Sequence, residues 1–170
     1  TPAGQLFIGD IRHLALKNLF DTSIAFTKAP ADLSVELLQK RINAHREKES
    51  ELLVAPEFFM HVKQVIPAIK NIDIQLKRGH YRTEMSAYRY DAIISMGNAN
   101  DTTTINDGDF VPQRNPNNLL ELKAMISDVS EPIVFRDLVN ARLLRDQLIQ
   151  NTLMSEKPAH TVDGVKQLVD

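Results

Sequence analysis

The spacing of apolar residues changes near residue 70, and this change constrains the fold more than any other feature. Before residue 70 the apolar residues recur at helical spacing in three stretches, which are about 14–27, 35–42 and 56–66. Asp32 or Ser34 can cap the second stretch, and Pro56 stands where the third would begin. We therefore expect three helices in this part of the chain.

Beyond residue 70 the period becomes two. Segments 72–76 and 88–96 alternate apolar and polar residues, which is typical of half-buried strands. Residues 77–87 between them are too polar for a core element, so we expect antiparallel neighbours joined by a long connection, and long connections are often functional. A continuous apolar run at 5–10 predicts a further strand, parallel and buried on both faces. Strands and helices together predict an α/β fold.

A polar stretch divides the chain. Residues 99–118 show neither period and are rich in Asn, Asp, Thr and Pro, so we expect a linker there. Asn118 followed by Glu121 indicates a capping box. After the linker, apolar spacing predicts helices near 119–126, near 139–153 and after a capping Thr161, and a strand at 132–135. We therefore expect residues 119–170 to form a small α/β segment apart from residues 1–98.

Composition excludes several classes of protein. The 170 residues contain no cysteine, which excludes disulfides, cysteine zinc ligands and thiol catalysis and favours a reducing cytoplasm. A formal net charge of −2 gives no general attraction to nucleic acid or to an anionic membrane, and no apolar run approaches the roughly 20 residues that span a bilayer. The five His are scattered without His-x-x-x-His spacing, so we expect no metal site.

Glycine is scarce. The chain has six Gly, and no two lie closer than five residues apart, so it has no Gly-rich loop through which backbone amides could approach a phosphate or an adenosine. A complete nucleotide-binding enzyme is therefore not expected within this chain. Because the first residue is Thr1 rather than Met, we expect these residues to be part of something longer.

The first candidate site follows the first predicted strand. Asp10, Arg12 and His13 stand directly after its apolar residues. In open α/β sheets the ligand crevice lies outside the carboxyl ends of the strands, where such polar side chains can reach a ligand. The alternative is structural: Asp10 caps the next helix and Arg12 pairs with a carboxylate.

The second candidate site is the connection between the two alternating strands, where basic and aromatic residues interleave. One interpretation is an RNA-binding patch, with bases stacked on tyrosines. Against it, alternation places Tyr88 and Tyr90 in the core. The other interpretation is a loop that presents Arg78, Tyr81 and Glu84 to a small substrate, with the carboxylate holding an amine. Glu84 can equally form a salt bridge with Arg78 or Arg82 of the same loop.

Five motifs in and between these segments occur together in this order. They are Gly4-Gln5-Leu6-Phe7-Ile8-Gly9-Asp10-Ile11-Arg12 with Leu16 and Phe20, Glu49-Ser50-Glu51-Leu52-Leu53, Pro56-Glu57-Phe58-Phe59, Ile72-Asp73-Ile74-Gln75-Leu76-Lys77-Arg78-Gly79-His80-Tyr81 with Glu84, and Tyr88-Arg89-Tyr90-Asp91. With these motifs the chain resembles methyltransferase domains embedded in nonribosomal peptide synthetases. The likeness covers roughly residues 4–96 and continues less distinctly through 139–143.

The resemblance implies a fold and a reaction. The fold would be the C-terminal half of a class I, Rossmann-like methyltransferase sheet with a helical insert, in which the last strand is reversed and lies between the other two. Such domains move a methyl group from S-adenosylmethionine to an aminoacyl thioester on a carrier protein's phosphopantetheine arm, usually at nitrogen. The Gly-rich, cofactor-binding half would lie before Thr1, so we expect this fragment alone to bind no cofactor and to be inactive.

The resemblance also implies site residues and partners. Glu84 would orient the acceptor amine as the catalytic residue, and the substrate-binding residues would be Asp10, Arg12, His13, Arg78 and Tyr81. The partners would be the loaded carrier protein and the adenylation domain of the same synthetase, with no nucleic acid and no membrane. The alternative is a non-catalytic interaction or spacer module that docks the carrier or adenylation domain.

Overall fold

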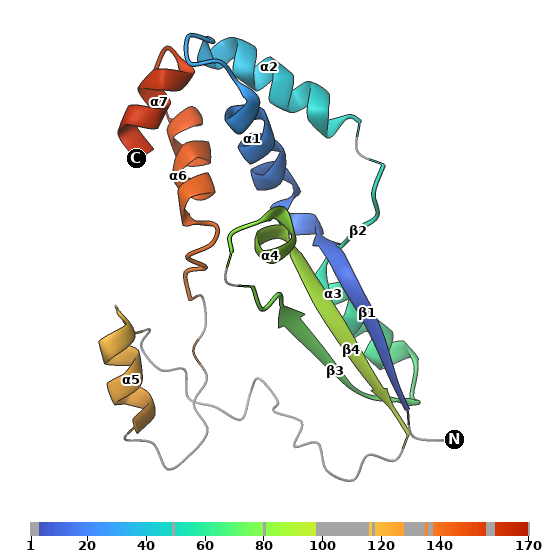
Figure 1. The fold of residues 1–170 in the computed structure, drawn as a ribbon. Helices are drawn as coiled ribbons and strands as arrows, with labels where there is room; N and C mark the ends of the chain where they lie inside the picture. Colours follow the sequence, from blue (N-terminus) through green and yellow to red (C-terminus); the bar gives the residue numbers. More distant parts are fainter. Residues whose placement is uncertain are drawn as a thin grey trace. The chain divides into compact units, whose positions relative to one another are not determined.

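The chain forms two units in a computed structural model (Figure 1). One unit contains residues 1–100 and 141–170, and the other contains residues 101–140. The structure describes residues 4–48, 50–79, 81–97, 116, 118–127, 135, 138–155 and 159–169.

The first unit contains a four-stranded mixed sheet in the order β2-β1-β4-β3. The strands are β1 (Gly4–His13), β2 (Leu53–Val54), β3 (Ile69–Leu76) and β4 (Arg89–Met96). β1 and β2 are parallel, whereas β4 runs antiparallel to both of its neighbours, β1 and β3. The predicted antiparallel pair is therefore confirmed, as is the expected place of the last strand between the other two. With its helices, the sheet confirms the α/β class.

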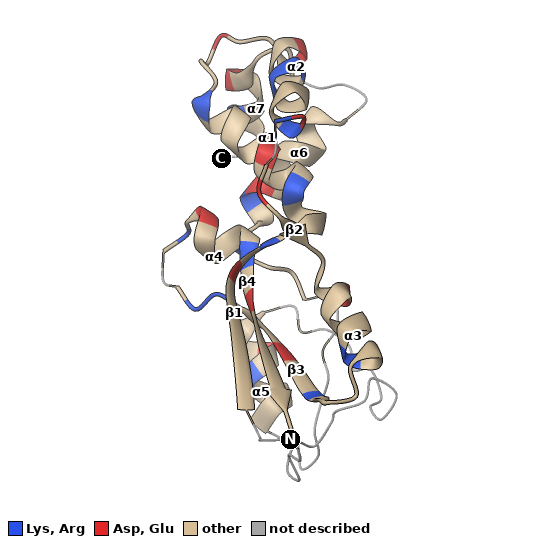
Figure 2. Ribbon diagram, turned by 90° about the vertical axis from the view of Figure 1, so that its right-hand side faces the viewer, with Lys and Arg blue, Asp and Glu red and all other residues tan. Residues whose placement is uncertain are grey.

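One face of the sheet packs against α3 (Pro56–Val65), which lies beside the strands in Figure 2. Pro56 occupies the first turn of this helix, as the sequence predicts. Phe59 of α3 is buried against alternate residues of β4, including Tyr90 and Ala92. The period-two pattern of β4 therefore separates the core face of the sheet from a face that carries the polar residues.

The expectation that the first strand is buried on both faces is wrong. Side chains in the first half of β1 are exposed, by 51% for Leu6 and 62% for Phe7. β2 is only two residues long and pairs with Arg12 and His13, so among the described residues nothing pairs with the edge of β1 on that side before Arg12. A continuous apolar run shows that both faces are suited to burial, but it does not show what covers them.

Four helices of the same unit form a second core. They are α1 (Lys17–Lys28), α2 (Val35–Arg46), α6 (Leu144–Leu153) and α7 (Val162–Val169), and α1 is preceded by a 3-10 turn, η1 (Leu14–Leu16). The predicted caps are present, since the Ser34 side chain accepts from the Leu37 amide and Thr161 from the Gly164 amide. α6 begins at Leu144 rather than near 139. The assignment of 1–98, 99–118 and 119–170 to different functional parts stays a prediction.

The connection between β3 and β4 contains a short helix, α4 (Glu84–Tyr88), that the sequence analysis missed. A capping box starts it, with Thr83 and Ser86 each bonding the other's backbone amide. Five residues are too few to show a helical apolar period, whereas the Thr-x-x-Ser spacing is a local signal.

In the second unit the structure describes α5 (Leu119–Ser127), where the Asn118 side chain accepts from the Glu121 amide at 2.9 Å, as the predicted capping box requires. The predicted linker, apart from Pro116 and Asn118, and residues 132–134 of the predicted strand lie outside the described residues.

Candidate functional site

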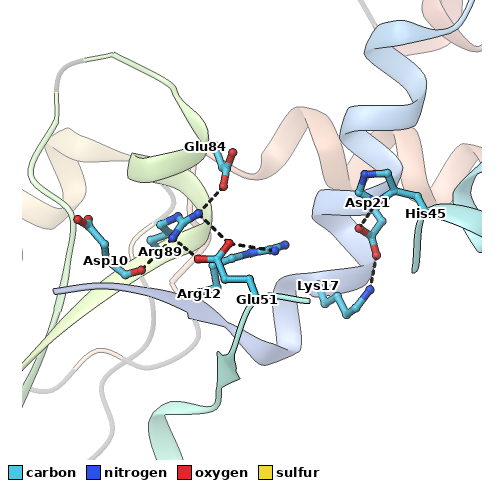
Figure 3. A network of polar contacts seen from close by, with 8 residues as sticks. All are labelled: Asp10, Arg12, Lys17, Asp21, His45, Glu51, Glu84 and Arg89. Carbon is cyan, nitrogen blue, oxygen red and sulfur yellow. Dashed lines mark hydrogen bonds and ion pairs between the residues drawn. The ribbon is translucent and has the colours of Figure 1, made fainter. Parts of the chain in front are cut away.

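A network of charged side chains lies at one end of the sheet, where β1 and β3 end and β4 begins (Figure 3). Arg12 and Arg89 are directly opposite each other in the β1–β4 ladder, so they share the face opposite α3. Glu51, in the link between α2 and β2, binds both. Arg89 donates to its two carboxylate oxygens at 2.5 and 3.1 Å, and Arg12 donates to Oε2 at 3.4 Å.

Arg89 is the centre of this network. It also donates to Oε1 of Glu84 at 2.8 Å and to the backbone carbonyl of Asp10 at 3.0 Å. Burial alone would lower the pKa of Arg89, but the bonds to Glu84 and Glu51 outweigh it and raise that pKa. Arg89 therefore stays charged and connects β1, α4 and the link before β2. Figure 3 shows the second oxygen of Glu84 pointing away from Arg89.

Asp10 marks an irregularity in β1. Its φ is 60° and the β1–β4 register shifts between Ile8 and Ile11, a strained conformation that Asp tolerates better than most residues. The Asp10 amide donates to Asp91 Oδ1 at 3.0 Å, and Lys77 Nζ lies 2.5 Å from Asp10 Oδ1 and 2.6 Å from Asp91 Oδ1. The alternative that Asp10 caps the following helix is wrong, since His13 stands at that position. The alternative that Arg12 pairs with a carboxylate is confirmed.

These pairings change the proton affinities of Asp91 and Lys77. Burial raises the pKa of Asp91, but hydrogen bonds from Lys77 and the Asp10 amide outweigh it, so that pKa is lowered overall. Burial alone would lower the pKa of Lys77, but the bonds to Asp10 and Asp91 outweigh burial, so that pKa is raised overall. Both groups are therefore held in their charged forms.

His13 does not join the network. It lies one residue beyond Arg12, so strand alternation places it on the opposite face of β1. Its ring makes an edge contact with Tyr90 at 5.6 Å between centroids. Burial lowers the pKa of His13, and the charge of Glu57 offsets part of that effect, so the imidazole is neutral at pH 7. The structure thus separates two residues, Arg12 and His13, that the sequence analysis grouped together.

Of the three predicted loop residues, one joins the network and the other two do not. Glu84 reaches the network, although through Arg89 rather than through a neighbouring arginine of its own loop. Arg78 and Tyr81 are exposed, Tyr81 by 84%, and within the described part of the chain no hydrogen bond or ion pair joins their side chains to the network. Tyr88 and Tyr90 are buried, as predicted, so neither can stack on bases.

A cavity of about 340 Å³ lies between α1, α4 and α6, and Glu84 contributes to its wall as well as to the network. Asp146 of α6 is buried beside it and accepts from the Tyr88 hydroxyl and from Arg82, both at 2.5 Å. Burial and the adjacent Asp146 raise the pKa of Tyr88 far above its usual value. The wall also includes Phe20 and Arg145. A small molecule that contacts Glu84 therefore has adjacent space of mixed polar and apolar character.

Glu51 is the main residue that sequence reasoning missed. It follows a run of charged residues after Ile42 that is typical of a solvated helix face, and nothing in its spacing indicates two arginine partners. Arg89, Asp91 and Lys77 lay within or beside the predicted strands, where alternation shows the face but not the partner. The described residues hold no group of three His, Asp or Glu placed to bind a metal ion, and no helix of sufficient length and apolarity to span a bilayer.

Comparison with known proteins finds nonribosomal peptide synthetases. The chain is 38% identical over 96 residues to chondramide synthase cmdD of Chondromyces crocatus, and this match covers 56% of the chain. It is 34% identical over 90 residues to cyclosporin synthetase simA of Tolypocladium inflatum, covering 53% of the chain. The match to the nonribosomal peptide synthetase TES of Alternaria alternata, at 29% identity over 167 residues, covers 92% of the chain and so extends well beyond residue 100.

The matched region is a small part of each synthetase. The chain spans 2% of the length of cmdD, 1% of simA and 3% of TES. No protein-family model matches the chain. The comparisons therefore show similarity to a short region of nonribosomal peptide synthetases, the class of protein that the resemblance also names.

Proposed function

We propose that this chain is the acceptor-side part of a methyltransferase domain within a nonribosomal peptide synthetase. In this proposal the neutral amine of an aminoacyl thioester on a carrier protein would take the methyl group of S-adenosylmethionine. The bond from sulfur to that methyl group would break, S-adenosylhomocysteine would leave, and the methylated nitrogen would release one proton to solvent. The observation that supports it most is the position of Glu84. It lies at the end of the sheet where β1 and β3 finish, it is fixed by Arg89, and it borders the 340 Å³ cavity. Ligand sites of open α/β sheets lie at this end.

The sheet itself supports the proposal. β4 runs antiparallel between β1 and β3, which is the strand arrangement that the resemblance implies. The edge of β1 before Arg12 is unpaired on the β2 side among the described residues, and it presents apolar side chains such as Phe7. Sheet edges of this kind are normally covered or paired. Further strands of the domain, from polypeptide outside these 170 residues, would pair at this edge.

The residues of this chain do not fit the cofactor, because the sequence has no Gly-rich loop to approach an adenosine. In the proposal the methyl donor is held by other polypeptide. The contribution of this chain is to bind the acceptor. The free carboxylate oxygen of Glu84 accepts a hydrogen bond from the amine N–H, and Arg89 fixes the direction of that carboxylate. Because the amine reacts in its neutral form, the effect of Glu84 is mainly one of orientation.

A second candidate function rests on a separate surface. An apolar groove of about 450 Å³ runs along the outer side of α3, and its wall includes Phe58, Val65 and Ile66, which are exposed by 56%, 73% and 42%. Exposed apolar patches often mark contacts with other proteins. This groove favours the alternative that the chain docks a carrier or adenylation domain without taking part in catalysis.

A methylation assay distinguishes the catalytic function from the docking function. It uses a synthetase segment that contains this chain together with its preceding sequence. The variant is Glu84→Gln, which keeps the size of the side chain. The matched control is Glu36→Gln on α2, where Glu36 forms an exposed pair with Lys40. The substrate is the carrier protein with an aminoacyl group attached to it. We expect E84Q to lower the rate of methyl transfer by about 10- to 100-fold, because the amine is no longer held in its reactive orientation. E36Q should stay at the wild-type rate.

Mass spectrometry of the carrier-bound product measures the rate. Equal rates for E84Q and E36Q would contradict the role of Glu84 and favour the docking alternative. In a second measurement, the 170-residue chain alone should show no heat of binding with S-adenosylmethionine. Micromolar binding would show that this chain holds the methyl donor itself. It would contradict the proposal that other polypeptide holds the donor while this chain binds the acceptor.

A further inference from the structure

The connection between β3 and α4 is held by an arginine from much later in the chain. Arg142 Nη1 donates to the backbone carbonyls of Lys77 at 2.5 Å and Ser86 at 3.1 Å, and Nη2 donates to that of Gly79 at 3.1 Å. Two of these carbonyls stand where the connection leaves β3, and the third is in α4. One guanidinium therefore joins the two ends of the segment that contains Glu84.

A second arginine, within the connection itself, bonds back to the region around Arg142. Arg82, within the connection, donates from Nε to the backbone carbonyl of Arg142 at 2.9 Å, and its Nη2 lies 2.5 Å from Asp146 Oδ2. The same carboxylate oxygen accepts from the hydroxyl of Tyr88, the last residue of α4. Asp146 and Tyr88 are each 5% exposed, so this part of the contact is shielded from water. Arg142 and Arg82 thus form a reciprocal clamp. Arg142 holds the backbone of the connection, and Arg82 holds the backbone of Arg142 and the side chain of Asp146 in α6.

The geometry of arginine suits this position. Its planar guanidinium directs five N–H donors outward in fixed directions, whereas the three donors of lysine share a single nitrogen. Here two different nitrogens of one guanidinium bond the three carbonyls, an arrangement that one ammonium nitrogen does not reproduce. Glu84 lies between Gly79 and Ser86 in the sequence, so its place beside Arg89 depends on how these carbonyls are held.

We propose that Arg142 is a positioning residue for Glu84, so that residues 141–146 form part of the acceptor site rather than a segment apart from it. As a statement about methyl transfer this inference rests on the function proposed above. As a statement about the location of Glu84 it stands by itself. Arg142 contacts neither the acceptor nor the donor in this proposal, and it acts through the backbone of the clamped segment.

Hydrogen exchange in the 170-residue chain tests the clamp directly. We expect the amides of 81–88 to exchange about tenfold faster in Arg142→Gln than in the wild type, because bonds to a charged donor are lost. Amides of β4 between Asp91 and Ile94 should be unchanged. The control is Arg41→Gln, since Arg41 is an exposed residue of α2. Exchange in R142Q equal to that in R41Q would overturn the proposal.

Chemical rescue distinguishes positioning from general destabilisation. Low-millimolar guanidinium should restore slow exchange in Arg142→Ala and should not do so in Arg142→Lys, whose ammonium already occupies the space. Failure of rescue in R142A, or accelerated exchange throughout the unit, would overturn the proposal.

Kinetics of the longer synthetase segment provide the second test. With the wild type active, R142Q should lower kcat for methyl transfer at least tenfold while the KM for loaded carrier changes less than twofold. A wild-type kcat in R142Q would refute the positioning role even if methylation by the wild type is established. If the wild type transfers no methyl group, the proposed function fails, and the exchange and rescue results still decide whether Arg142 positions Glu84.

Discussion

Replacing Ile149 with Ala tests whether the segment after residue 140 belongs to the core of the first unit. Ile149 of α6 is 1% exposed and packs in one cluster with Phe26 of α1, Leu38 of α2 and Val162 of α7. More than a hundred residues separate Ile149 from Phe26 and Leu38 along the chain. Truncation at this position therefore removes contacts that exist only if α6 is packed against the N-terminal helices.

The expected loss of stability follows from this burial. Truncating a fully buried Ile to Ala removes its transfer free energy and leaves a cavity, which together cost about 2–5 kcal/mol. For a side chain at 1% exposure surrounded by other helices we expect a loss of about 3–4 kcal/mol. Leu148, the preceding residue of the same helix, is 44% exposed. Because burying a whole Leu contributes about 1.5–3 kcal/mol, Leu148→Ala should cost only about 1 kcal/mol.

Urea unfolding followed by circular dichroism at 222 nm compares the two variants. The difference between I149A and L148A is the informative quantity, because both shorten an aliphatic side chain on the same helix and change helix propensity in the same direction. An unchanged m-value would show that the compactness of the end states is the same. A loss in I149A no larger than that in L148A would refute the packing of α6 in this core.

Two further predictions concern titration. Because the folded pKa of Asp91 lies below its unfolded value, its pairing stabilises the fold above about pH 4 and is lost as the pH falls through the folded pKa. The difference in Tm between wild type and Asp91→Asn should therefore be largest near pH 7 and shrink at pH 3, and a constant difference would contradict this. Asp146→Asn should lower the pKa of Tyr88, seen as earlier phenolate absorbance at 295 nm on raising the pH. If the pKa of Tyr88 in this variant equals that in the wild type, burial alone raises it.

The sequence predicts well those features that depend on local chemistry. Ser34 caps α2 because a hydroxyl next to an apolar stripe satisfies a free amide, and Pro56 begins α3 because it has no amide to satisfy. Alternation in β4 correctly assigns Tyr90 to the core. In each case the deciding interaction lies within a few residues along the chain, so the pattern contains the information.

The missed features depend on pairs that are distant in sequence. Glu51 joins the network only because the β1–β4 register places Arg12 opposite Arg89. Arg142 bonds carbonyls 56 to 65 positions earlier, and no side-chain pattern can mark a backbone acceptor. The exposure of Phe7 also reflects what stands beside β1 rather than the apolar run itself.

The charge of the network indicates which kind of ligand it suits. Four carboxylates, including Glu51 and Glu84, surround three cations, so the cluster has one negative charge in excess. A phosphate or a nucleic acid would be repelled by the excess negative charge of this network. An amine, in contrast, can donate to the second oxygen of Glu84, which has no partner among the described residues. The excess of carboxylates in the network is therefore consistent with the proposal that Glu84 receives an amine.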